Sequence, residues 1–267
     1  MAIINRTPDS FFDRGATFAL DRAVAAALTA AADGADWVDV GGVPFGRGAP
    51  VGLAEELDRV VPVIEAIHAR SDVVISVDTT NAEVARRSIE AGASVVNDTS
   101  GLSDPRLAAV VAASTASLVI THSNGVPRSE PQSPRYDDVM ADVVAYLRER
   151  VDHAVSAGVP RGRLIVDPGH DLNKNTVHTL EITRRLEEVV ALGLPTLAAV
   201  SNKDFIGEAI DREQGRRLEG SLAAAVICIM KGARIVRMHD VPAAVAAVRL
   251  TEAVLGFRQP AYARHNV

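Results

Sequence analysis

Polar residues that could do chemistry recur at one kind of place in this chain, directly after short apolar segments. They are Asn5, Asp39, Asp78, Asn97, Asp98, His122, Asp167, Ser201, Asn202, Lys203, Arg237, His239 and Asp240. Any one of them could cap a following helix, because Asn, Asp and Ser are favoured at helix N-caps. Capping alone does not explain the whole set, so we predict that these side chains converge on one site.

The side-chain types in this set suit a ligand with two chemically different parts. Asp78, Asn97 and Asp167 offer carboxylates and an amide, which match a ring with adjacent N–H donors and a carbonyl, as at a pterin or guanine edge. Asn5 could donate an oxygen to Mg²⁺ or contact a diphosphate directly. The cationic members, which suit a phosphate or diphosphate, are Lys203, Arg237 and His239.

Other kinds of site are not indicated. No nucleophile, base and orienting residue form a recognisable triad, and neither a cysteine pair nor a His-Glu-x-x-His motif suggests zinc. His170-Asp171 could recruit a metal, but we interpret it as a solvated loop, and Arg216-Arg217 as a solvated approach to a helix. The single cysteine, Cys228, lies in an apolar run and is interpreted as a buried helical thiol.

Short β-branched segments alternate with longer Ala- and Leu-rich segments and must position these residues. The predicted strands are residues 2–5, 37–40, 73–77, 94–97, 117–121, 164–167, 196–200 and 234–238. The predicted helices are near residues 20–33, 54–70, 81–91, 105–113, 137–157, 176–192, 220–231 and 241–255. Glycines that suit left-handed helix C-caps are Gly34, Gly92, Gly158, Gly193 and Gly232.

Eight strand–helix units without a composition break predict an α/β protein, a single-domain (β/α)₈ TIM barrel over residues 1–267. A doubly wound open sheet is the alternative. Barrels of this class place their chemistry at the carboxyl ends of the strands. The polar residues fall at those ends, which supports the barrel.

Composition limits the class of partner. The 267 residues are 48% hydrophobic and carry a net charge of −6 with scattered basic residues. A Lys/Arg stripe, the expected footprint of nucleic-acid binding, is missing. No segment is long and apolar enough to span a bilayer and no signal peptide is recognisable, so we expect neither a nucleic-acid nor a membrane partner, and a cytoplasmic protein.

Several of the polar residues lie in longer motifs that follow one another in a fixed order. The first is Asn5-Arg6-Thr7-Pro8-Asp9-Ser10-Phe11-Phe12-Asp13-Arg14-Gly15. The others include Asp39-Val40-Gly41-Gly42, Ser76-Val77-Asp78-Thr79, Asn97-Asp98, Asp167-Pro168-Gly169, Gly220-Ser221-Leu222-Ala223 and Arg237-Met238-His239-Asp240. In order and spacing they resemble the motifs of dihydropteroate synthases, a family of pterin-binding barrels, over essentially the whole chain.

The resemblance implies the chemistry of that family, the condensation of 6-hydroxymethyl-7,8-dihydropterin diphosphate with p-aminobenzoate in folate biosynthesis, with Mg²⁺ as cofactor. It implies a homodimer through the late helices, although burial against the barrel explains the apolar run there equally well. The residues implied at the pterin are Asp78, Asn97, Asp167 and Lys203, and those at the diphosphate are Asn5, Arg237 and His239, with Asn5 also at the metal. The residues implied in catalysis are Asn5, Asp13, Lys203, Arg237 and His239.

The departures from the family motifs cluster on the aminobenzoate side. The family loop G-G-E-S-T-R-P-G-A reads G-G-V-P-F-G-R-G-A here, D-P-G-x-G-F-G-K reads D-P-G-H-D-L-N-K, and S-R-K-S reads S-N-K-D. The replaced positions are Phe45, Gly46, Leu172, Asn202 and Asp204, and the displaced loop arginine is Arg47. Asp171 and Asn173 replace glycines, which predicts an altered loop path because glycine adopts positive φ most freely.

Asp204 stands where the family serine should meet the aminobenzoate carboxylate. At ~4 Å and an effective dielectric of ~20, two like charges repel by roughly 4 kcal/mol, which is on the order of a thousandfold in affinity. That cost shrinks if Asp204 turns outward or is protonated.

We therefore expect a dihydropteroate synthase homologue that is inactive or strongly impaired with p-aminobenzoate. It would still bind pterin ligands, and weakly p-aminobenzoate or its sulfonamide and sulfone analogues. Three alternatives stay open: a working synthase with rearranged loops, a transferase for another amine or pterin, and a non-catalytic pterin-binding protein.

Overall fold

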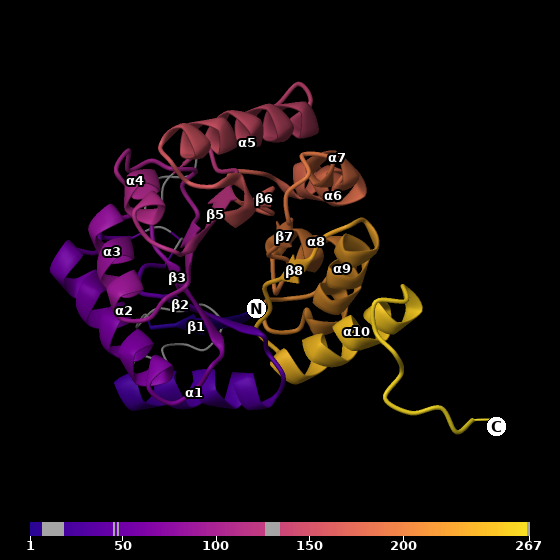
Figure 1. Ribbon diagram of the computed structural model, residues 1–267. Coiled ribbons are helices and arrows are strands. Elements are labelled where there is room, and N and C mark those ends of the chain that lie inside the picture. Colours follow the sequence, from indigo (N-terminus) through magenta and orange to yellow (C-terminus); the bar gives the residue numbers. More distant parts are fainter. Residues whose placement is uncertain (7–18, 45, 47, 126–133, 266–267) are drawn as a thin grey trace.

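A closed ring of parallel strands forms the centre of the computed structural model, which describes residues 1–6, 19–44, 46, 48–125 and 134–265 (Figure 1). One sheet has the order β1 (Ala2–Asn5), β2 (Trp37–Gly41), β3 (Val74–Asp78), β4 (Val95–Asp98), β5 (Ser117–Thr121) and β6 (Leu164–Asp167). The shorter strands β7 (Leu197–Ala198) and β8 (Ile235–Val236) pair with each other. Parallel bridges from Val166 to Thr196 and from Ala2 to Met238 close the ring. The predicted (β/α)₈ barrel is confirmed, and the open doubly wound sheet is excluded.

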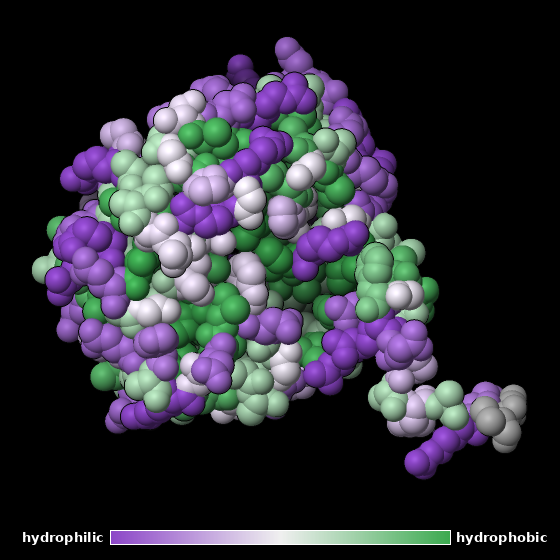
Figure 2. Space-filling view, in the orientation of Figure 1, coloured by the Kyte–Doolittle hydropathy of each residue, from purple (hydrophilic) through white to green (hydrophobic). Residues whose placement is uncertain are grey.

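Helices surround the ring, and Figure 2 shows hydrophilic side chains over much of their outer surface. The first five are α1 (Leu20–Ala32), α2 (Leu53–His68), α3 (Ala82–Glu90), α4 (Leu107–Ala112) and α5 (Val139–Ser156). After the short 3₁₀ helix η1 (Arg161–Arg163) come α6 (Thr176–Arg184), α7 (Glu187–Val190), α8 (Asp204–Ile210), α9 (Leu218–Met230) and α10 (Val241–Val254).

The predicted elements match these bounds closely, with three corrections. The single helix predicted over residues 176–192 is two helices, α6 and α7, because Arg185 leaves the helical conformation at the end of α6. The helix α8, between β7 and β8, was not predicted; it has only seven residues, too few to show a clear period. The last two strands are two residues long instead of five.

The core is divided into two apolar layers by the alternation of side chains along each strand. Leu118 and Ile120 of β5 belong to the large cluster between the sheet and the helices, whereas Val119 belongs to a separate cluster. That smaller cluster, which by alternation lies inside the barrel, consists of Val95, Val119, Ile165 and Leu197 with Met1, Trp37, Val74, Ala199 and Ile235 packed against it. Cys228 is fully buried, as predicted.

Local signals fix the ends of the helices. Side-chain oxygens of Asn81, Asp138, Asn175 and Asp240 accept hydrogen bonds from the first-turn N–H groups of α3, α5, α6 and α10. The five glycines predicted as left-handed C-caps all have positive φ; they are Gly34, Gly92, Gly158, Gly193 and Gly232. These caps set where each helix stops and the chain returns to the barrel.

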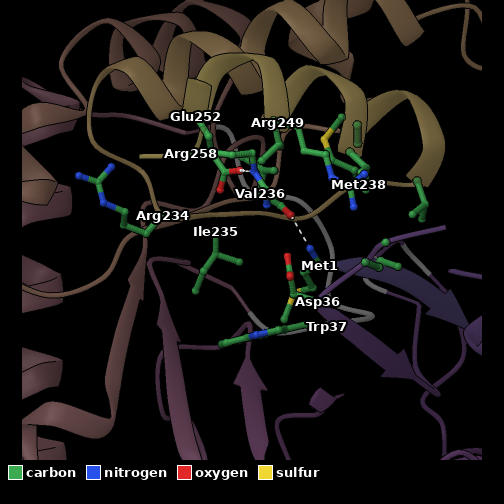
Figure 3. Close-up of a pocket in the computed structure, with 17 residues that line it drawn as sticks. Met1, Asp36, Trp37, Arg234, Ile235, Val236, Met238, Arg249, Glu252 and Arg258 are labelled. Carbon is green, nitrogen blue, oxygen red and sulfur yellow. Dashed lines mark hydrogen bonds and ion pairs between the residues drawn. The ribbon is translucent and has the colours of Figure 1, made fainter. Parts of the chain in front are cut away.

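The two ends of the barrel differ in character. At the amino-terminal end of the strands, a cavity of about 330 Å³ lies between the barrel and α10, lined among others by Met1, Trp37, Ile235 and Arg249 (Figure 3). The opposite end carries the polar strand-end residues. None of the helices that the structure describes combines the length and apolar character needed to cross a membrane.

Candidate functional site

The strand register places predicted site residues on one level of the barrel mouth. Asn5 pairs with Gly41, Gly41 with Asp78, and Asp78 with Asn97. A Cβ atom on Gly41 would lie 3.6 Å from Asn5 Oδ1 and 3.8 Å from Asp78 Oδ2, so the two oxygens flank the backbone of that glycine. The first and third strands thus present their terminal polar groups to the same space.

Arg237, after β8, bridges two carboxylates across the mouth. Its Nε donates to Asp39 Oδ2 at 2.6 Å, and its Nη2 donates to Asp78 Oδ2 at 3.0 Å. Asn97 Nδ2 donates to the same oxygen of Asp39 at 3.1 Å. Asp39 is fully buried and Asn97 nearly so, and a buried charge is tolerated only when it is paired and hydrogen-bonded. The network therefore fixes four side chains from four strands in one arrangement.

Burial raises the pKa values of two carboxyl groups at the barrel mouth towards the neutral range. It raises the pKa of Asp78 to about 7, with the Arg237 charge opposing the shift and the Asp39 charge adding to it. It raises the pKa of Asp167 to about 6, against the hydrogen bond from Gly169 and the charge of Lys203. Both groups can change charge near pH 7, which is typical of functional sites.

A buried lysine holds the loop after β6 against the end of β5. Lys174 Nζ contacts His122 Nδ1 at 2.8 Å and donates to the carbonyls of Leu172 at 2.9 Å and Gly169 at 3.0 Å. Burial lowers the pKa of Lys174 to about 7 and that of His122 to about 3. The histidine is therefore neutral, and it serves as a hydrogen-bonding partner rather than as a charge.

The same loop orients the carboxylate at the end of β6. The Gly169 N–H donates to Asp167 Oδ1 at 2.7 Å. Gly169 has φ 70°, and a Cβ atom there would lie 2.0 Å from the carbonyl oxygen of His122. Only glycine fits this close approach of two backbones.

The segment after β7 brings in the remaining cationic residues. Lys203 is the N-cap residue of α8, and burial lowers its pKa although Asp171 opposes the shift. Ser201 Oγ accepts the backbone N–H of His239 at 3.1 Å and contacts its Nδ1 at 2.9 Å. The loops after β7 and β8 are thereby joined.

Asp204, the first residue of α8, points into solvent and is paired. Its side chain is 78% exposed, and its Oδ1 accepts a hydrogen bond from Arg217 Nη1 at 2.7 Å. Arg217 is 10% exposed and also donates to the carbonyl oxygens of Asn202 and Arg212. The interpretation of Arg217 as a solvated residue is wrong, because it packs over Gly207, whose Cβ would lie 2.3 Å from its Nε.

Three non-glycine residues in the loops after β6 and β7 adopt the left-handed conformation. Asp171 and Asn173 have φ of 62° and 53°, and Asn202 has φ of 58°. Asp171 Oδ2 accepts the N–H of Phe205 at 3.2 Å and so caps α8. Asp171 and Asn173, which replace family glycines, thus adopt positive φ, a region that Asp and Asn tolerate better than other non-glycine residues, and the altered loop path stays a prediction.

His170 was interpreted as part of a solvated loop, and this is wrong. It is fully buried and its ring stacks on Phe205, with centroids 6.1 Å apart. Burial, helped by the charges of Lys203 and Lys174, lowers its pKa to about 3. Neither ring nitrogen has a hydrogen-bond partner among the described residues.

Comparison with known proteins agrees with this geometry. Residues 1–239 match the family model described as pterin binding enzyme. The chain belongs to the pterin-binding enzyme family. It is 44% identical over 266 residues to the "Inactive dihydropteroate synthase 2" of Mycobacterium leprae, covering 97% of this chain and 91% of that protein.

A relative named simply dihydropteroate synthase is almost as similar. The dihydropteroate synthase of Escherichia coli is 41% identical over 260 residues, covering 97% of this chain and 92% of the relative. The crystal structure of the Yersinia pestis dihydropteroate synthase with a sulfonamide drug complex superposes with a TM-score of 0.92 at 38% identity, covering 97% and 94% of the two chains. The resemblance inferred from the motifs is confirmed at the level of the family and fold.

Within this pterin-binding barrel, the predicted site residues divide into those the structure brings together and those it does not describe. Asn5, Asp78, Asn97, Asp167, Lys203, Arg237 and His239 all lie at the carboxyl ends of the strands. Asp13, Phe45 and Arg47 lie outside the described residues. Gly46 has open space where a Cβ would stand, and Leu172 lies in the loop closed by Lys174.

The predicted site of this family member omitted residues that the structure makes central. Asp39 was recognised as a strand-end residue. Its position in the sequence, two residues before the double glycine, does not reveal that it accepts hydrogen bonds from both Arg237 and Asn97. Lys174 and His122 are far apart in sequence and meet only through the β5–β6 pairing. A signal was available for Asp39: a charged residue within a strand whose neighbours are apolar must find a partner.

Proposed function

We propose that this chain is a dihydropteroate synthase homologue that binds a dihydropterin diphosphate but condenses it with p-aminobenzoate weakly or not at all. The whole chain, residues 1–267, forms one such pterin-binding barrel in this proposal. Support comes from its likeness to both the inactive and the active relatives. The contrast between the ion-paired strand-end residues and the altered charge at Asp204 favours impairment.

The observation that carries the proposal is the ion pair between Asp204 and Arg217. The motif alignment places Asp204 where the family serine meets the aminobenzoate carboxylate. A carboxylate at this point repels a second carboxylate, and its pairing with Arg217 occupies a cation that could otherwise attract one. Because Asp204 is 78% exposed, solvent screens the repulsion, so the penalty is well below that of a buried charge.

In the pterin half, Asp78, Asn97, Asp167 and Lys203 bind the ring by hydrogen bonds to its N–H groups and carbonyl. The carboxyl groups accept N–H donors most strongly when ionised, and their raised pKa values place that ionisation close to pH 7. Arg237 uses Nε and Nη2 on the two aspartates. Its Nη1 makes no hydrogen bond within the described chain and is available to a diphosphate oxygen.

The chemical step in a synthase requires mainly that the two substrates are held in position and that the charge on the leaving diphosphate is stabilised. Asn5, Arg237 and His239 stabilise the negative charge that develops on the departing diphosphate. The ring-binding residues hold the methylene carbon where the amine can attack it. Asp13 is included in this proposal from the motif alone.

The residues present suit a Mg²⁺ ion that takes most of its ligands from the substrate and water and few from the protein. No group of three or more His, Cys, Asp or Glu residues that could hold a metal occurs among the described residues. Mg²⁺ commonly takes one or two protein oxygens, with waters and substrate phosphates completing its shell. Asn5 Oδ1, beside Gly41 and close to the level of Asp78, would hold the ion, which would neutralise charge on the leaving diphosphate.

A second candidate function is transfer of the pterin group to an amine without a carboxylate. The exposed carboxylate of Asp204 favours it, since this group would repel an anionic acceptor and tolerate a neutral or cationic one. Sulfonamide and sulfone analogues, which carry no carboxylate, would then lose less affinity than p-aminobenzoate. A non-catalytic pterin-binding role and a synthase with compensating loops are the remaining outcomes.

The assembly and location are part of the same proposal. We expect a cytoplasmic homodimer formed through α9 and α10, supported by the exposed apolar side chains on these helices. They are Leu218, Ile227, Met230, Leu250 and Val254.

The deciding experiment is a coupled assay with dihydropterin diphosphate, p-aminobenzoate and Mg²⁺, run beside an authentic synthase, together with calorimetry of pterin binding. Pterin binding with little or no turnover is the expected result. Turnover comparable to the authentic synthase would overturn the proposed impairment. Turnover with an uncharged arylamine alone would select the second candidate, and absence of pterin binding would overturn both.

A further inference from the structure

The β6–α6 loop is closed by one buried amine that the proposed chemistry does not use. Lys174 is 7% exposed, and its Nζ reaches His122 Nδ1 and three backbone carbonyls, those of His122, Gly169 and Leu172. Lysine is rarely buried without a carboxylate partner. Placing a flexible, strongly hydrated side chain here is costly, which suggests a specific task.

The contacts of Lys174 lead directly to a pterin-side carboxylate. The carbonyl of Gly169 accepts from Lys174 at 3.0 Å and from the N–H of Leu172 at 3.1 Å. The N–H of the same glycine donates to Asp167 Oδ1 at 2.7 Å. Lys174 therefore fixes the orientation of Gly169, and Gly169 fixes that of Asp167.

Lys174 also acts on Asp167 through its charge. The amine favours ionisation of Asp167, and Asp167 in turn raises the pKa of Lys174 against burial, which is the dominant cause and brings it to about 7. The other titratable groups that face Lys174 come from every neighbouring element. They are His122 after β5, His170 and Asp171 in its own loop, His178 of α6 and Lys203 before α8.

We propose that Lys174 is a positioning residue for the pterin-binding carboxylate Asp167: it closes the β6–α6 loop onto His122, holds the Gly169 N–H on Asp167, and supplies a positive charge beside it. The inference rests on the proposed pterin-binding function. It adds that pterin affinity depends on a residue that does not touch the pterin.

The test compares Lys174→Met with Lys231→Met, a matched control at the end of α9, where the lysine pairs with Glu187 on the outer surface. Calorimetry with 6-hydroxymethyl-7,8-dihydropterin is run between pH 6 and 8.5. Lys174→Met is expected to weaken binding about fivefold at pH 6, the effect of a rise of about one unit in the pKa of Asp167 on its ionised fraction, and by less at pH 8.5. The difference shrinks at high pH because the native lysine itself loses its proton above about pH 7.

A ligand-independent readout separates this inference from the proposed function. Hydrogen exchange of the Gly169 amide, followed by NMR in the free protein, is expected to accelerate in Lys174→Met and not in Lys231→Met. Lys174→Gln, which keeps donors but carries no charge, should restore part of the protection while keeping the shifted pH profile. This variant also carries the test if Lys174→Met does not fold.

The outcomes are distinct. An equal loss of affinity at pH 6 and pH 8.5 would overturn the contribution of the Lys174 charge. Unchanged Gly169 exchange would overturn the positioning role on its own. Absence of pterin binding by the wild-type protein at every pH would refute the proposed function, and the Gly169 exchange would still decide whether the lysine orients the loop.

Discussion

The two parts of the barrel mouth proposed to bind the pterin and the acceptor, here called the pterin half and the acceptor half, are built in different ways. In the pterin half, side chains stand at strand ends and are buried or half-buried, and Arg237 has two opposite charges, those of Asp39 and Asp78, within hydrogen-bonding distance. In the acceptor half, the residues stand on loops and at the first turn of a short helix. Asp204 there is exposed and its partner Arg217 comes from the next loop.

This difference explains where sequence change has accumulated. A substitution in the buried network leaves a charge unpaired and is strongly destabilising, so the network changes as a whole or not at all. A substitution on the loops changes exposed charge at little cost to folding. A chain can therefore keep the surface for one substrate and lose or redirect the surface for the other.

The strongest test of this comparison is Arg237→Met. It leaves Asp39 and Asp78 in the barrel without their counter-charge, so we expect the free energy of unfolding to fall by about 3–5 kcal/mol. Pterin affinity should fall by more than about a hundredfold, the order expected for loss of charged hydrogen bonds. Urea denaturation and calorimetry measure the two effects.

The matched control is Arg258→Met, which removes an exposed arginine from its pair with Glu252. It should change stability by no more than about 1 kcal/mol. If the two variants behaved alike, the mouth would not depend on its buried network, and the contrast between the halves would fail.

The second test uses pH. The folded-state pKa values of Asp78 and Asp167, about 7 and about 6, lie above the ordinary value of 3.8. The protonated forms are thus favoured by folding, and the stability that these two groups contribute is fully present below pH ~4 and lost as pH rises towards 7. Pterin affinity, which the ionised carboxylates strengthen as better acceptors, should rise over the same range.

Opposite trends in stability and affinity are the expected signature. Urea denaturation and pterin calorimetry at pH 5, 6, 7 and 8 measure them in parallel. The double variant Asp78→Asn, Asp167→Asn lacks both titrating groups, so its free energy of unfolding should fall less between pH 5 and pH 7 than that of the wild-type protein. Stability that rises between pH 5 and 7 through these two residues would contradict the assignment.

The difference between the halves also determines what the sequence alone could predict. The barrel was predictable because each strand is short and β-branched and each helix is long and Ala-rich, and because glycines such as Gly92 mark the helix ends. The strand-end residues followed from the barrel, since all parallel strands end at one face. Asp78 and Asn97 were therefore placed correctly at the ends of their strands, where the structure pairs them with each other.

Contacts between loops were not predictable in the same way. Arg217 and Asp204 are separated by thirteen residues and meet through the turn after α8, a helix too short to be read from periodicity. The contact between Lys174 and His122 joins residues that are 52 positions apart in the sequence. Such pairs depend on loop paths, which the period of apolar residues does not encode.

A third test addresses the acceptor half directly. Asp204→Ser restores the family residue and frees Arg217, so affinity for p-aminobenzoate should increase, measured by calorimetry on protein saturated with a pterin ligand. The gain should be less than about tenfold, because the carboxylate is exposed and exposed pairs contribute at most about 1 kcal/mol.

Asp152→Ser, an exposed position on the outer surface of α5, is the control and should change nothing. A gain approaching a thousandfold would show that Asp204 alone excludes p-aminobenzoate. A decrease in affinity would show that the aspartate is not on the acceptor side.

The smallest expected effect is that of Asp171→Gly, which restores a family glycine. The change relieves a φ of 62°, worth roughly 1 kcal/mol for a non-glycine residue. It also removes the hydrogen bond from the Phe205 N–H to Asp171 Oδ2, worth about 0.5–1.5 kcal/mol. The two effects oppose each other, so the free energy of unfolding should change by less than about 1 kcal/mol, while hydrogen exchange at Phe205 becomes faster.

Asp211→Gly isolates the two contributions, because Asp211 ends α8 with φ 52° and its carboxylate makes no hydrogen bond within the described residues. This control should gain stability from relief of φ alone, and the difference between the two variants measures the cap on α8. A loss of several kcal/mol in Asp171→Gly would mean that this loop is fixed as firmly as the pterin half. The two halves of the mouth would then differ in charge but not in rigidity, and loop tolerance could not explain why only one of them has changed.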